Sequence, residues 1–172
     1  MNTTANTTPA TLLNLNDMIE QTLDTIPDAP DYSNPPAGEY NLLVKDVKVE
    51  TYQVKEKTKD GVVTPAYEAQ RLKITYSVNE TKSTAAGEIP VPDGTMFTET
   101  FQGTEQGLSF FKSRIKTVMN ASDLAGVSLG DMMNSIKGTS FDARISIKKS
   151  PKPNSTTEFY ENIQIKVIPA SA

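Results

Sequence analysis

Aromatic and cationic side chains fall at alternate positions of one extended segment. Tyr67, Arg71 and Lys73 are separated by even numbers of residues, so they share one face if residues 66–78 form a strand. Lysine and arginine bind phosphates, and tyrosine rings stack on unpaired bases. The pattern therefore predicts a surface that binds single-stranded nucleic acid. The competing interpretation is that these cations only keep an exposed strand soluble.

The same residue types recur where they could extend this surface. Lysines are concentrated in a polar loop predicted over residues 55–65, and more cations alternate along residues 139–149 and enter the following loop. The predicted DNA-binding residues are Tyr52, Lys55, Lys57, Lys59, Tyr67, Arg71, Lys73, Arg144, Lys148, Lys149, Lys152 and Tyr160. Phe97 and Phe101 share a strand face with Glu99; we expect both in the core, the alternative being that they stack on bases.

The composition leaves little for catalysis. The chain has no Cys and no His, which excludes thiolate nucleophiles, cysteine zinc sites and the Ser-His-Asp triad. It also has no Walker loop, GxGxxG segment or DxD motif. We therefore expect a protein that is not an enzyme, with no catalytic residues, no metal and no cofactor.

Charge divides the sequence into two regions. The net charge is −4, yet residues 1–36 hold five of the 21 acids and none of the 17 bases, leaving residues 37–172 at +1. We predict an acidic mobile arm over 1–36 and one domain over 37–172. Apolar residues at helical spacing within the arm predict a short amphipathic helix, which either docks reversibly or packs permanently on the domain: Leu12, Leu15, Ile19, Leu23 and Ile26.

The domain is predicted to contain three strands, a helical region and two strands. The strands are expected over residues 39–52, 66–78, 95–101, 139–149 and 158–168. In the first, the step from Val44 to Val47 breaks the period of two and indicates a β-bulge between Lys45 and Asp46. Thr104 and Ser128 are expected to cap two helices. The apolar stripes of those helices are Leu108, Phe111, Ile115 and Val118, then Leu129, Met132, Met133 and Ile136.

This order predicts a mainly β protein: a five-stranded OB-fold-like barrel with a helix between strands three and four, plus the acidic N-terminal arm. A small β-sandwich would give similar alternation. In an OB-fold, the face of strands two and three and the loops between strands one and two and between four and five bind oligonucleotides. Most of the predicted DNA-binding residues fall in those places.

Several segments resemble bacteriophage-encoded single-stranded DNA-binding proteins with an OB-fold, over residues 36–168. The resemblance is carried by Pro36–Tyr40, Tyr67–Ile74, Gly138–Ile145 and Glu158–Ile163. It implies that the chain coats single strands during phage replication or recombination. Such proteins often end in an acidic tail that recruits partners, whereas this chain ends Val167-Ile168-Pro169-Ala170-Ser171-Ala172 without an acid.

We therefore expect sequence-tolerant, non-enzymatic binding and protection of single-stranded DNA. The expected partners are single-stranded DNA, replication or recombination proteins and further copies of the chain. No apolar run is long enough to span a membrane, no signal peptide is apparent, and the absence of Cys fits the host cytoplasm. The alternative is a β-rich phage structural or assembly protein whose arm docks on a neighbouring subunit. A third hypothesis, an inhibitor that mimics acidic surfaces, fits the arm only.

Overall fold

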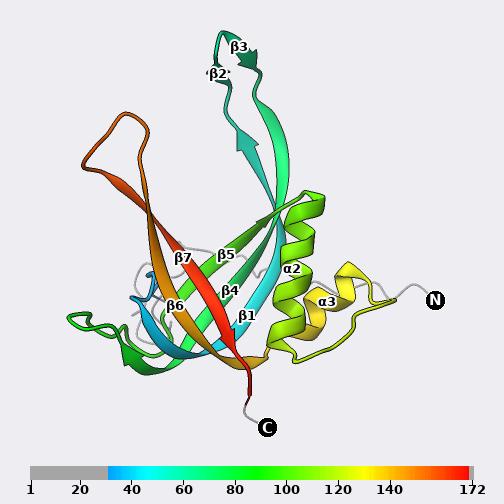
Figure 1. Cartoon of the computed structure of the whole chain (residues 1–172). Coiled ribbons are helices and arrows are strands. Elements are labelled where there is room, and N and C mark those ends of the chain that lie inside the picture. Colours follow the sequence, from blue (N-terminus) through cyan, green and yellow to red (C-terminus); the bar gives the residue numbers. More distant parts are fainter. Residues whose placement is uncertain (1–30, 171–172) are drawn as a thin grey trace, which may run out of the picture.

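The protein is mainly β, built on one five-stranded antiparallel sheet. The computed structural model describes residues 31–170, so the helix predicted from Leu12 to Ile26 lies outside the described residues. The sheet has the order β5-β4-β1-β6-β7, and two helices lie between β5 and β6 in the chain (Figure 1). Its elements are β1 (Gly38–Val54), β4 (Tyr67–Thr84), β5 (Met96–Gln102), α2 (Glu105–Val118), α3 (Leu129–Ile136), β6 (Ser140–Pro151) and β7 (Phe159–Ile168).

The central strand β1 bends because it carries an extra residue. Val44 pairs with Tyr76 and Asp46 pairs with Thr75, so Lys45 is left over and the predicted bulge is confirmed. Before the bend β1 pairs with both β4 and β6, and beyond it with β4 alone. The bulge increases the local twist, which lets one sheet curve round its own core.

The sheet does not close into a barrel, so this part of the prediction is wrong. Within residues 31–170, β5 and β7 are the two edges and no ladder joins them. The physical reason is visible at Ile165 of β7. Its carbonyl oxygen accepts a hydrogen bond from Arg114 Nη2 at 2.8 Å, from the adjacent helix α2 and not from the backbone of β5.

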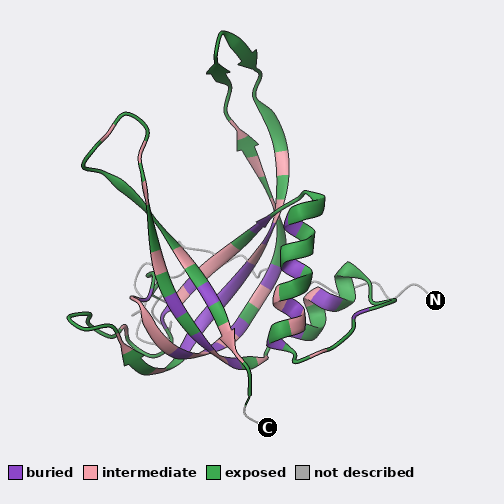
Figure 2. Cartoon of the chain, viewed as in Figure 1, coloured by how far each residue is buried: buried purple, intermediate pink, exposed green. Residues whose placement is uncertain are grey.

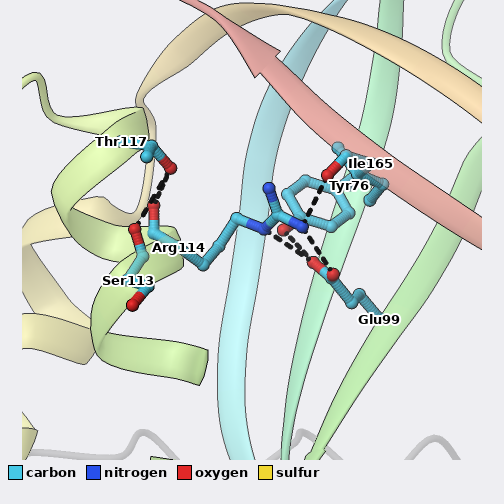
Figure 3. Close-up of polar contacts among 6 residues, drawn as sticks. All are labelled: Tyr76, Glu99, Ser113, Arg114, Thr117 and Ile165. Carbon is cyan, nitrogen blue, oxygen red and sulfur yellow. Dashed lines mark hydrogen bonds and ion pairs between the residues drawn. The ribbon is translucent and has the colours of Figure 1, made fainter. Parts of the chain in front are cut away.

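Arg114 joins the two edges through a polar network (Figure 3). Besides Ile165, its Nη2 donates to Glu99 Oε1 on β5 at 2.9 Å, and Tyr76 donates to Glu99 Oε2 at 2.7 Å. Burial, followed by the charge of Glu99, raises the pKa of the Tyr76 hydroxyl well above its usual value. Burial alone would lower the pKa of Arg114, but Glu99 outweighs it and the pKa is raised. At neutral pH the Tyr76 hydroxyl therefore stays protonated and Arg114 stays charged, so both remain hydrogen-bond donors.

The core lies inside the curve of the sheet and under α2 (Figure 2). Phe97 and Phe101 are buried, as expected, and the Tyr76 ring lies 5.3 Å from that of Phe97. Alternation of apolar and polar residues along 66–78 and 139–149 predicts one inward face for each of these strands. Both predictions are confirmed by the burial of Leu72, Ile74, Tyr76, Val78, Phe141, Ala143 and Ile145. Four other apolar residues that the same patterns place in stripes or on inward strand faces are substantially exposed: Val49, Leu108, Leu129 and Phe159.

The loop predicted over residues 55–65 is a second, two-stranded sheet. β2 (Lys57–Lys59) and β3 (Val62–Thr64) continue the β1–β4 hairpin away from the core (Figure 1). Asp60 and Gly61 connect them with φ of 52° and 78°, the positive values that a tight hairpin turn requires. β4 also runs to Thr84, six residues beyond its predicted end.

No helix within residues 31–170 is long and apolar enough to cross a membrane.

Both predicted helix caps are confirmed. Thr104 Oγ1 accepts from Gly107 N at 3.1 Å, and Ser128 Oγ accepts from Asp131 N at 3.1 Å. Gly107 is itself constrained, because a Cβ there would lie 2.0 Å from the backbone oxygen of Gln102. The first turn of α2 therefore sits directly against the end of β5.

Gly107→Ala should destabilise the protein, although alanine normally favours a helix. The added methyl group must displace backbone, which we expect to cost about 1–3 kcal/mol. Urea unfolding measures the effect, with Ser109→Ala, exposed on the same helix, as the control that should be neutral or slightly stabilising. A Gly107→Ala protein as stable as the control would show that α2 does not approach β5 this closely.

Arg114→Met should lower the free energy of unfolding by about 1–3 kcal/mol, because it leaves the Glu99 carboxylate half-buried without its cation. The side chains of Arg114 and Glu99 are 15% and 21% exposed, so solvent softens the loss. Lys112→Met removes an exposed cation from the same helix and should change stability little. Equal effects of the two substitutions would argue against the network.

Candidate nucleic-acid interface

The outer face of β1 and β4 brings an aromatic ring and two cations together. The guanidinium carbon of Arg71 lies 4.9 Å from the centre of the Tyr52 ring, a cation–π contact. The Tyr52 hydroxyl donates to Gln102 Oε1 at 2.6 Å, which fixes the ring from the far side of β4. We call Tyr52 and Arg71 the stacking platform, since rings and guanidinium planes both stack on bases.

A carboxylate holds the platform in place. Glu50, opposite Arg71 in the β1–β4 ladder, accepts from Arg71 Nε at 2.7 Å and from Lys73 Nζ at 3.3 Å. Hydrogen bonds from Arg71 and then from Lys73 hold the pKa of Glu50 below its usual value. Sequence analysis did not select Glu50, although it is two positions before Tyr52 and therefore on the same strand face.

A pocket of about 490 Å³ opens beside the platform, where β5 passes into α2. Tyr67 lines it with its side chain 52% exposed, and Gln70 and Gln102 add amide groups. Gly103 lines it as well and donates its N–H to the Gln70 oxygen at 2.9 Å; a Cβ at Gly103 would lie 2.5 Å from that oxygen. Glu68 lines the pocket too, so it is bounded by rings, amides and one carboxylate, which suits a flat polar ligand.

Exposed lysines follow the β2–β3 hairpin. Lys55, Lys57 and Lys59 are exposed, and none has an ion pair within residues 31–170. Val62 and Val63 are exposed on the opposite strand of the hairpin. Glu56 and Asp60 lie among these lysines, so residues 55–60 carry a net charge of +1, well away from the core.

The β6–β7 hairpin carries the other predicted residues, and most of its cations are paired. Lys149 contacts Glu161 and Lys152 contacts Glu158, both at 3.4 Å, and Lys152 Nζ lies 5.6 Å from the centre of the Tyr160 ring. Arg144, lower on β6, pairs with Glu39 of β1. Lys148 is exposed and unpaired among the described residues.

The predicted residues thus form two groups and not one. Tyr52, Tyr67, Arg71 and Lys73 gather at the root of the β1–β4 hairpin, with the lysines beyond them. The second group lies on the β6–β7 hairpin, and both hairpins rise from the same end of the sheet (Figure 1). Gln102 and Glu50 were missed because neither an amide nor an acid is a signal for nucleic acid on its own.

Neither metal ligands nor known relatives explain these residues. Between residues 31 and 170, no group of three or more His, Cys, Asp or Glu side chains could hold a metal ion. Comparison with protein-family models, with curated proteins and with solved structures finds no match to this chain. Its function must therefore be argued from the arrangement of its own side chains.

Tyr67→Ala should weaken binding of single-stranded DNA by about 1–3 kcal/mol while leaving stability almost unchanged. The ring is 52% exposed, so its removal costs the core little but takes one wall from the pocket. Fluorescence anisotropy with labelled oligo-dT measures the affinity, and thermal unfolding measures the stability.

Tyr32→Ala is the matched control, because Tyr32 is 63% exposed and bridges to Met96, at the opposite end of β5 from Gln102. It should bind like the unmodified protein. If both tyrosine variants bind equally well, the pocket makes no contact with DNA.

Proposed function

We propose that this protein binds and protects single-stranded DNA without sequence preference and without catalysis. The observation that carries the proposal is the contact between Arg71 and Tyr52 on an open strand face. Two hairpins that bear lysines rise at the same end of the sheet (Figure 1). Stacking on any base combined with charge along a backbone is how sequence-tolerant single-strand binding is achieved.

The strand order supports an OB-fold assignment for the described residues. β1 pairs with both β4 and β6, the helices fall between the third and fourth long strands, and the edges are left apart. An OB-fold is a five-stranded Greek-key barrel that is commonly partly open. On this assignment the hairpin between its first two strands and the hairpin between its last two are the ones that bind oligonucleotides, and both carry predicted residues here.

The resemblance to phage single-stranded DNA-binding proteins extends the proposal to its setting. Coating of single strands during phage replication or recombination, in the host cytoplasm, is the role that suits a small binding protein of this kind. The arm over residues 1–36, with five acids and no base, is then a segment for contact with replication or recombination proteins.

The direct test compares a labelled oligo-dT with a duplex of equal length by fluorescence anisotropy. We expect the single strand to bind at least ten times more tightly, because paired bases cannot reach the platform. Several phosphate contacts should also reduce affinity by about tenfold or more between low and moderate salt. Equal binding to both forms, or none with micromolar protein, would sink the proposal.

A second function, as a phage structural or assembly protein, is favoured by one observation. β5 and β7 are edges with no strand partner along most of their length in the described part of the chain, and free edges readily pair with other chains. Sedimentation over a wide concentration range distinguishes the two. Large assemblies formed without DNA would favour the structural role.

A further inference from the structure

Glu50 occupies the position where a phosphate would meet the two cations beside the platform. Its Oε2 lies 2.6 Å from Arg71 Nη2, and its Oε1 lies 3.3 Å from Lys73 Nζ. Both cations therefore already hold an anion that belongs to the neighbouring strand. A DNA phosphate that approached this face would have to displace the carboxylate or lie beside it.

This pairing is better shielded than the other ion pairs of the interface. The side chains of Glu50, Arg71 and Lys73 are 27%, 32% and 25% exposed. Those of Lys149 and Glu161 are 64% and 56% exposed, where solvent screens the attraction and the pair opens easily. Among the carboxylates of this interface, Glu50 is thus the one least screened by solvent, and its charge acts most strongly on a bound ligand.

The lysines of the β2–β3 hairpin lack such a partner. Lys55, Lys57 and Lys59 have no ion pair in the described residues, so their charge is available to a polyanion. The interface is therefore divided: the hairpin offers unpaired charge, and the strand face offers a ring, a guanidinium plane and a fixed carboxylate. Glu50 offsets one of the two positive charges of Arg71 and Lys73, so phosphates are favoured more at the hairpin than at the strand face.

We propose that Glu50 determines specificity by keeping phosphates away from the platform of Tyr52 and Arg71 and reserving it for unpaired bases. This inference rests on the proposed single-strand function. A duplex presents its phosphates outward and its bases inward, so it would bring phosphate against the carboxylate. A single strand can turn its bases to the platform and its phosphates to the hairpin lysines. Like-charge contact with the wrong partner is an effective way to discriminate.

The test is Glu50→Gln in the full chain, with oligo-dT and a duplex of equal length at two salt concentrations. The substitution releases Arg71 and Lys73 to bind phosphate. For the single strand, log K against log salt should steepen by about 0.7 for each cation released. The duplex should gain more affinity than the single strand. The ratio of single-strand affinity to duplex affinity should therefore fall by about fivefold or more.

Glu80→Gln is the matched control for loss of one negative charge. Glu80 is exposed on β4, far along the strand from Arg71 and outside the pocket, so its removal should leave the preference and the salt slope unchanged. Glu50→Asp retains the charge and should retain most of the preference. A purely geometric role for Glu50 would instead make Asp, which is one methylene shorter, more damaging than the isosteric Gln.

A second pair of variants tests the inference without altering Glu50. Lys73 already contacts Glu50, so Lys73→Gln should change single-strand affinity less than about twofold. Lys57→Gln removes an unpaired cation and should weaken it by about threefold or more at low salt. Equal losses at Lys57 and Lys73 would contradict the division of the interface.

Thermal unfolding of each variant separates binding effects from loss of structure. A folded Glu50→Gln protein with unchanged preference and salt slope, or with weaker binding to both DNA forms, would overturn the inference while leaving single-strand binding intact. Failure of the unmodified protein to bind either DNA would instead overturn the proposed function, and this inference with it.

Discussion

The whole arrangement depends on how one arginine bridges an open sheet. Arg114 extends from α2 to the carboxylate of Glu99 on β5 and to the carbonyl oxygen of Ile165 on β7. Without a bridge, the two edges would each present unpaired backbone groups beside a buried core, which is costly. Because a side chain joins the edges in place of a ladder, β5 and β7 need not run side by side. The sheet can then stay open while the core beneath it remains covered by α2.

The gap between β5 and β7 also affects where the β1–β4 and β6–β7 hairpins lie. β1 pairs with β4 along its whole length but with β6 only from Gly38 to Leu43, so beyond the bulge the two halves of the sheet separate. Each half continues as a hairpin whose tip is mostly exposed (Figure 2), and both hairpins carry lysines. The extra residue at Lys45 and the side-chain bridge at Arg114 therefore act together: one turns the halves apart, and the other stabilises the gap between their edges.

The sequence predicted the five long strands and both helices, but not the open edges of the sheet. Alternation placed Leu72, Ile74 and Tyr76 inward, and the step from Val44 to Val47 located the bulge, because both signals are local along the chain. Closure of the barrel depends on β5 and β7, more than fifty residues apart, and on an arginine whose partners no periodicity reveals. The β2–β3 hairpin could have been predicted, since Asp60-Gly61 is a strong hairpin signal flanked by residues able to form strands. Ion pairs such as that of Arg71 with Glu50 depend on register and could not be read from the order of residues.

Register also explains why a count of cations misjudges a binding face. Arg71, Lys73, Arg144, Lys149 and Lys152 each face a carboxylate in the structure, whereas Lys55, Lys57, Lys59 and Lys148 have none among the described residues. Paired cations contribute little to counterion release, so the salt dependence of binding should follow the second set. The first set still matters, because pairing holds the Arg71 plane over the Tyr52 ring, where an unpaired guanidinium would be free to turn away. On the proposed single-strand function, one residue type thus serves two purposes: a cation held by an acid of the neighbouring strand becomes part of a surface for bases, and a cation without an ion pair becomes a contact for phosphate.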